Sequence, residues 1–211
     1  MSDELPKGWA TAPLAEIAKI NPRHPKGLDD SMLISFARMT ALSESKPEFE
    51  SLEERTLGEV RKGFTHFAEG DVLFAKITSC MENGKGAVAT GPRNGIGCGT
   101  TELHVIRPLA GIGPHYVYRF LAQPSVRRAA KENFTGTAGQ ARVPTNFIQQ
   151  IEVPLAPLAE QRRIVAKLEL SECGHGCLSR KLANDCFVQH RSAWSPEYEH
   201  EHDLLCWNTA I

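Results

Sequence analysis

Two polar turns hold the side chains with the most suggestive chemistry. One is the stretch 134–144, in which Gln140 and Arg142 stand close to glycines, and the other carries Asn83 and Lys85. Amide and cationic side chains have the hydrogen-bonding patterns that the major-groove edges of DNA bases require, and such contacts are usually made from loops on a rigid body. The pattern is therefore compatible with contact with DNA. The alternatives are that Asn83 only shapes its turn and that Arg142 only caps or pairs within the fold.

Further basic residues have the chemistry to hold phosphates. Residues 125–132 are predicted to form a helix that carries Arg127, Arg128 and Lys131, and Lys76 ends the strand predicted before the Asn83 turn. Lysine and arginine supply the sequence-independent part of DNA affinity. A solvated helix face and a solvated strand end remain open as alternatives for these four cations.

The charge of the chain is unevenly distributed. Of 211 residues, 24 are Lys or Arg and 25 are Asp or Glu, which gives a net charge of −1. Counted in segments, residues 1–60 carry −4, residues 61–170 carry +6 and residues 171–211 carry −3. The middle segment is basic enough for a few phosphate contacts, so the charge permits DNA binding without requiring it.

Patterns that would indicate catalysis or cofactor binding are incomplete. Asn21–His24 begins like the Asn-Pro-Pro-aromatic motif of amino-methyltransferases but departs from it at the third and fourth positions. Gly84 and Lys85 lack the spaced glycine and the Ser or Thr of a phosphate-binding P-loop. Cys173–Cys177 offers zinc-ligand residue types, but no second cysteine pair answers it. We therefore predict no catalytic residue, no metal site and no cofactor in this chain.

The elements that must position these residues are typical of one mixed α/β domain over residues 1–155. Strands are predicted over residues 9–12, 32–36, 72–77, 87–90 and 101–106, and helices over 13–18, 114–122 and 125–132. Eight apolar residues are predicted to lie in the core: Phe74, Ile77, Val88, Leu103, Val105, Phe120, Leu121 and Ile151. The acidic stretch 44–59 is expected to be a solvated excursion.

A different kind of element follows the domain. Residues 156–170 are predicted to begin a spacer helix, with Leu158, Val165 and Leu168 near heptad spacing. Because an isolated helix of about 14 residues is marginal in water, this apolar stripe is expected to pack on a helix of a second copy or of a partner subunit. Residues 171–211 show no sustained period and are predicted to be an irregular tail, non-native or out of frame.

No apolar run approaches the roughly 18 residues needed to span a bilayer, and the first six residues lack the basic and apolar regions of a signal peptide. These observations predict a cytoplasmic protein without a membrane partner. The six cysteines are expected to be free thiols.

Four blocks of the sequence follow one another in an informative order. They are Gly70–Thr78 running into Glu82–Ala87, then Gly95–Pro108, then Gly136–Pro144, and finally Ile151–Leu155 followed by Pro157–Val165. In this order and at this spacing they resemble the specificity subunits of type I restriction–modification systems, over about residues 5–169. Ser79 and Met81 depart from the residues common in the first block.

The resemblance implies a recognition domain of mixed α/β fold that docks on one half of a split double-stranded DNA target. It also implies a spacer helix that positions a methyltransferase (modification) subunit, which a motor-endonuclease (restriction) subunit joins. S-adenosylmethionine, ATP and Mg²⁺ would belong to those partners. Family members have two recognition domains, so the chain is expected to be a truncated or half-size member. Two copies paired through the spacer helix would read two inverted half-sites.

A second function class stays open alongside this one. The chain could be a remnant or interaction module that keeps the fold but no longer assembles or reads DNA. An autonomous DNA methyltransferase or nuclease is disfavoured, because no catalytic constellation is visible in the sequence.

Overall fold

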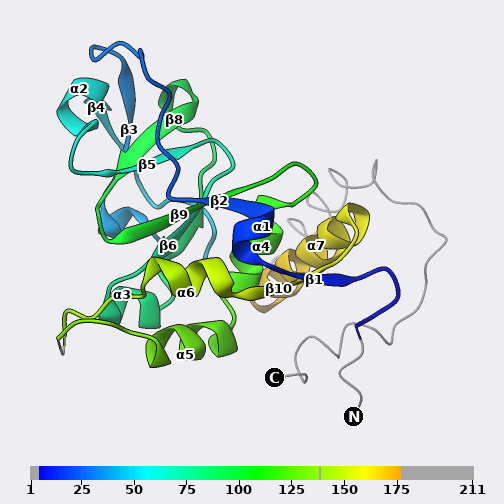
Figure 1. Ribbon diagram of the computed structural model, residues 1–211. Coiled ribbons are helices and arrows are strands. Elements are labelled where there is room, and N and C mark those ends of the chain that lie inside the picture. Colours follow the sequence, from blue (N-terminus) through cyan, green and yellow to red (C-terminus); the bar gives the residue numbers. More distant parts are fainter. Residues whose placement is uncertain (1–4, 138, 177–211) are drawn as a thin grey trace.

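The computed structural model describes residues 5–137 and 139–176, with side chains described as far as Glu172. Figure 1 shows a mixed α/β fold, as predicted, with two four-stranded sheets in the body of the domain and a two-stranded sheet beside helix α7. None of the helices in the described ranges is both long and apolar enough to cross a membrane.

The central sheet is antiparallel and has the order β2-β9-β6-β7. Its strands are β2 (Ala18–Ile20), β9 (Leu103–Pro108), β6 (Val72–Ala75) and β7 (Gly86–Val88). All four residues of β6 are buried, which explains why the sequence shows a continuous apolar run there instead of alternation. Helix α4 (Pro114–Leu121) packs on β6, β7 and β9 and buries five residues of its own.

The second sheet has the order β4-β3-β8-β5 and lies at the α2 end of the molecule (Figure 1). Its strands are β4 (Glu53–Thr56), β3 (Leu33–Ala37), β8 (Ile96–Gly99) and β5 (Thr65–Ala68). The pair β3–β8 is parallel and the other two pairs are antiparallel. Glycine is required at position 97 of β8, because a Cβ there would lie 2.2 Å from the Phe67 ring.

The expectation of a solvated excursion over residues 44–59 was wrong for its second half. That part forms the edge strand β4 and enters helix α2 (Leu57–Val60). The helix begins with a capping box. The Glu59 backbone amide donates to the Thr56 hydroxyl, and the Thr56 backbone amide donates to the Glu59 carboxylate. An edge strand needs few apolar side chains, so the charged sequence of β4 does not show the alternating pattern by which a strand is predicted.

The remaining elements are short helices and turns, the two-stranded sheet and the helix that follows it. They are α1 (Leu14–Ile17), the 3₁₀ turns η1 (Met39–Ala41) and η2 (Arg93–Gly95), α3 (Thr78–Glu82), α5 (Pro124–Glu132), α6 (Thr145–Gln150), the pair β1 (Ala10–Pro13) and β10 (Glu152–Leu155), and α7 (Leu158–Gly176). Helices α4, α5 and α7 lie close to their predicted positions. Helices α3 and α6 were not anticipated.

The core forms three clusters of buried residues. Six of the eight predicted core residues are buried, namely Phe74, Val88, Leu103, Val105, Phe120 and Leu121. Ile77 and Ile151 are half-buried, because each lies where a regular element has just ended. Helix α7 continues through residues 171–176, which were predicted to be irregular. The side chains of Cys173–Cys177 and the rest of the predicted tail to residue 211 lie outside the described residues.

Candidate nucleic-acid interface

The 134–144 loop is a short hairpin that is bonded to the end of β6. Thr135 and Arg142 exchange backbone hydrogen bonds of 3.0 and 2.8 Å. The Thr78 amide donates to the Ala141 carbonyl at 3.1 Å, and the Val143 amide donates to the Lys76 carbonyl at 2.9 Å. The loop is therefore closed at its base by the Thr135–Arg142 pair and held to the body of the domain through residues 141–143, as a recognition loop on a rigid scaffold would be.

Arg142 uses its guanidinium to brace this loop. Its Nε and Nη2 donate to the two carboxylate oxygens of Glu102 at 2.8 Å each, and its Nη1 donates to the Gln140 carbonyl at 2.7 Å. The hydrogen bonds from Arg142 hold the pKa of Glu102 below its usual range. Bidentate pairing of this kind fixes geometry as well as charge.

Lys76 and Gln140 complete what we call the Glu102 cluster: Lys76, Glu102, Gln140 and Arg142. The Lys76 backbone amide donates to the Glu102 carbonyl at 3.0 Å, and its ammonium also lowers the pKa of the Glu102 carboxyl. The Gln140 side chain is exposed and makes no hydrogen bond within the described ranges. Gln140 thus presents a side-chain amide that has no hydrogen-bond partner among the described residues, on a loop that Arg142 stabilises.

His104 supports the loop from inside, a role that the sequence analysis missed. The residue is 2% exposed, with Nε2 2.8 Å from the Val143 carbonyl oxygen and Nδ1 3.3 Å from the Asn21 side-chain amide. Because a carbonyl only accepts, Nε2 carries the proton. Burial lowers the pKa of His104, so the ring is neutral at pH 7. A histidine within an apolar strand pattern was the available signal.

The other predicted residues form a second group, the α5 cluster: Asn83, Lys85, Arg127 and Arg128. Lys85 Nζ donates to the Leu42 carbonyl at 3.3 Å, and Asn83 donates from its amide to a Glu44 carboxylate oxygen at 3.1 Å. These contacts hold the turn at Asn83–Gly86 against the 42–45 segment. The two side chains are therefore already partnered in this structure.

Arg127 and Arg128, which are neighbours on α5, differ in their contacts. Arg127 Nε donates to the Ala122 carbonyl at 2.8 Å, at the C-terminal end of α4, and Nη2 donates to the same oxygen. Arg128 forms neither an ion pair nor a hydrogen bond with the residues described here. Within the α5 cluster, Arg128 is the cation most available to a phosphate.

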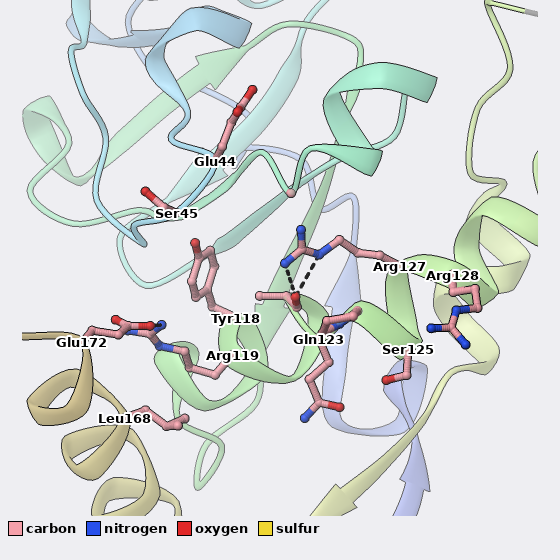
Figure 2. A pocket seen from close by; sticks show the side chains of 13 residues that line it. Glu44, Ser45, Tyr118, Arg119, Gln123, Ser125, Arg127, Arg128, Leu168 and Glu172 are labelled. Carbon is pink, nitrogen blue, oxygen red and sulfur yellow. Dashed lines mark hydrogen bonds and ion pairs between the residues drawn. The ribbon is translucent and has the colours of Figure 1, made fainter. Parts of the chain in front are cut away.

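A groove of about 440 Å³ opens between α4, α5 and α7 (Figure 2). Arg127 and Arg128 border it from α5, Tyr118 lines it from α4, and Glu44 faces them from the other side. An ion pair between Arg119 and Glu172 closes the α7 end. The groove carries both signs of charge, so it is not a simple anion site.

Helix α3 connects the two clusters. Its first residue, Thr78, is bonded to the 134–144 loop, and the Asn83 turn follows its last residue, Glu82. Helix α3 packs on α5, and Lys131 pairs with Glu82 at 2.6 Å. The elements that carry the seven predicted DNA-contacting residues therefore lie around α3, at the α3–α5 end of the molecule (Figure 1). They are the end of β6, the Asn83 turn, α5 and the 134–144 loop.

The stripe predicted on the spacer helix is partly covered within the chain. Val165 and Leu168 pack against the main core cluster, and α7 contacts α4. Leu158 is 38% exposed and Leu170 is 46% exposed. Two of the three stripe residues thus pack on the core of the same chain, to which α4 contributes, and the sequence expectation of an outside helix did not consider this.

His24, His66 and Cys98 place nitrogen and sulfur donors within 4.8 Å of one another, the donor set that suits zinc. His66 Nδ1 already accepts from the His24 amide at 3.1 Å, and His66 Nε2 lies 2.9 Å from the Arg61 carbonyl oxygen. Burial lowers the pKa of His24 to about 4 and raises that of Cys98 to about 12. The positive charges of the Arg23 and Arg61 side chains lie beside the two rings and would repel a metal cation. In this structure the hydrogen bonds of His24 and His66 support the 21–30 loop.

Comparison with known proteins places this geometry in context. The family model described as "Type I restriction modification DNA specificity domain" matches residues 6–170. The chain is 42% identical over 165 residues to the type I restriction enzyme EcoAI specificity subunit of Escherichia coli, and 42% identical over 163 residues to the EcoEI specificity subunit of the same organism. These matches cover 78% and 77% of this chain but only 28% and 27% of the two relatives.

The fold has a solved counterpart. The crystal structure of the HsdS subunit from Thermoanaerobacter tengcongensis matches with a TM-score of 0.62 at 21% sequence identity. The match covers 94% of this chain and 53% of that one. The likeness shows a shared fold and accounts for about half of the larger protein.

Proposed function

The chain belongs to the type I restriction modification DNA specificity domain family, and on that premise we propose that it reads DNA sequence as one recognition domain of a type I specificity subunit. The family match carries this proposal, because it runs from residue 6 to residue 170, through the 134–144 loop and into α7. We propose that the chain takes no covalent step itself.

The contacts of the seven candidate residues support different roles for them. Gln140 is exposed on a braced loop and is proposed to meet a base edge, for which its amide has the bidentate pattern that adenine requires. Arg128 and Lys76 are proposed to hold phosphates. Asn83, Lys85, Arg127 and Arg142 are the other proposed DNA-contacting residues; each would reach DNA only by exchanging or sharing its present partner.

Assembly is proposed to run through α7. Leu158, with its exposed side chain, and the outer parts of Val165 and Leu168 would meet a methyltransferase (modification) subunit or the α7 helix of a second copy. A motor-endonuclease (restriction) subunit would join that complex. S-adenosylmethionine, ATP and Mg²⁺ would then be bound by those subunits, since the residues of this chain are proposed for recognition alone.

The test is a binding selection. The full chain is purified with a cognate type I modification subunit and bound to a library of random DNA duplexes, and the recovered sequences are determined. We expect one short block of fixed bases for each recognition domain. Recovery of random sequence at the same affinity would overturn the proposal and favour an interaction module that keeps the fold without reading DNA.

A further inference from the structure

Gln161 is a buried polar residue at the start of helix α7. The residue is 2% exposed, although it lies one turn into a helix whose neighbouring residues Arg162 and Arg163 are exposed. Burying an amide costs free energy unless its hydrogen bonds are made inside the protein. Its partners therefore indicate why a glutamine stands here.

Those partners come from two separate segments. Gln161 Oε1 accepts from the Gly113 amide at 2.8 Å, and Nε2 donates to the Gly111 carbonyl at 3.4 Å, both in the loop that enters α4. Nε2 also donates to the Ala156 carbonyl at 2.9 Å, in the link between β10 and α7. One side chain thus joins α7 to the strand before it and to the loop that precedes α4.

A second attachment lies about three helical turns further along α7. Arg119 on α4 donates from both terminal nitrogens to the Glu172 carboxylate, at 2.5 and 2.8 Å. One turn before Glu172, the Glu169 carboxylate lies 3.9 Å from His115 Nδ1. Helix α7 is therefore held against α4 near its start and again towards its end, which fixes a direction as well as a position.

We propose that Gln161 is a positioning residue that sets the direction in which α7 leaves the recognition domain. The inference deepens the proposed function, because the direction of α7 decides where a subunit bound to that helix lies relative to the loop that carries Gln140. Without Gln161, the core contacts of Ile164 and the Arg119–Glu172 pair would keep α7 attached. The directional hydrogen bonds near its start would be gone, and apolar packing there would not fix the angle at which α7 leaves the domain.

The first measurement concerns the helix alone. Spin labels are placed by unnatural amino acids at the exposed positions Lys62 and Lys167 of the full chain, and the distance distribution is recorded for the parent and for Gln161→Leu. Leucine keeps the apolar packing and removes all three hydrogen bonds. We expect a broader or shifted distribution in this variant. Gln149→Leu, the same substitution at an exposed position on α6, is the control and should leave the distribution unchanged.

Thermal unfolding of the same variants separates positioning from folding. A Gln161→Leu protein that unfolds as a cooperative unit but has a broadened distribution supports the proposal. An unchanged distribution would overturn it, and so would loss of the folded domain, because Gln161 would then hold the domain together instead of aiming the helix.

The effect of Gln161 on assembly is measured in the complex with the modification subunit, as base selection and as the rate of DNA methylation. We expect Gln161→Leu to select the same bases as the parent while the DNA methylation rate of the complex falls. If the parent selects no bases at all, the proposed function fails while the distance measurement still decides the role of Gln161. If Gln161→Leu changes the selected bases, the residue acts on recognition and the inference is wrong.

Discussion

The Arg127 guanidinium lies where a side chain at position 84 would begin. A Cβ at position 84 would lie 2.2 Å from Arg127 Nη1, and the φ of Gly84 is +81°. The absence of a side chain therefore leaves room for the Arg127 guanidinium over the turn that carries Asn83 and Lys85. The predicted turn glycine has a packing role in addition to its conformational one.

Replacing Gly84 with alanine should destabilise the domain by more than its backbone angle alone explains. The left-handed conformation costs a non-glycine residue about 1–2 kcal/mol. Gly91→Ala is the matched control, since its φ is +65° and nothing lies within 4 Å of the added Cβ. Urea unfolding of both variants should show the larger loss for Gly84→Ala. Adding Arg127→Ala should remove the excess, and an excess that persisted would mean that the arginine is not its cause.

Gln140→Ala should relax base selection at one or two positions of the target and leave the others unchanged. A lost bidentate contact costs roughly 1–3 kcal/mol of discrimination at one base pair. The measurement is the binding selection described above, with Gln149→Ala as the control for an exposed glutamine outside the loop. A uniform loss of affinity over all sequences would demote Gln140 to a structural or phosphate-contacting role.

The role of Arg142 can be separated from that of Gln140 through its partner. If Arg142 acts by bracing the loop, Glu102→Gln should alter base selection in the same way as Arg142→Ala, because either change breaks the bidentate pair. If Arg142 itself meets a base, only Arg142→Ala should relax a position. The two selections, run in parallel, decide between these results.

Arg128→Gln should weaken binding to every DNA sequence alike. Loss of one phosphate contact reduces the slope of log affinity against log salt concentration by about one. Arg93→Gln, at an arginine outside both clusters, should leave the slope unchanged. An unchanged slope for Arg128→Gln would mean that Arg128 does not contact a phosphate and belongs to a solvated face of α5.

Stability should fall as the pH is lowered from about 6.5 towards 4. Burial, with the nearby His66 ring as the next cause, lowers the pKa of His24 to about 4, and burial likewise lowers the pKa values of His66 and His104. The folded state therefore binds fewer protons than the unfolded state in this range. The stabilisation that comes from keeping these rings neutral in the folded state is fully present above pH 6.5, the ordinary pKa of histidine. It is lost as the pH falls through the lowered pKa values.

Urea midpoints between pH 4 and pH 8 give the measurement. His24→Gln should flatten the pH dependence, because it removes the histidine whose pKa burial lowers to about 4. Replacing His115, which is half-exposed and stands outside this group of buried rings, is the control. A midpoint that rose on acidification would contradict the assignment of neutral rings in the folded protein.

The sequence predicted the elements whose signals are local. Helices α4 and α5 begin with proline and have one apolar face, and β6 is a fully buried strand with a continuous apolar run. Strand β4 was missed because an edge strand rich in charge has no alternating pattern. Helices α3 and α6 are too short to establish a period of 3.6 residues.

The candidate site also has features that the sequence predicted and features that only the fold reveals. Glycines and polar residues marked the 134–144 loop and the Asn83 turn. The partners of Arg142 and Lys85 could not be predicted, since Glu102 and Leu42 lie 40 and 43 residues away and only the fold brings them near. The role of Gln161 was hidden for the same reason, because a glutamine in a charged helix gives no sign that it is buried.

The pairing of β1 with β10 has a consequence for inheritance. Ala10 lies opposite Leu155 in this antiparallel pair, so the chain enters the domain and leaves it for α7 at neighbouring points. Adjacent strands are about 5 Å apart, and a different domain could join the same helix if its ends had that separation and it kept the groups that hold Gln161 and Glu172. Recombination at these two points would exchange one DNA preference for another in a single event, while the helix and whatever binds it stayed as they were.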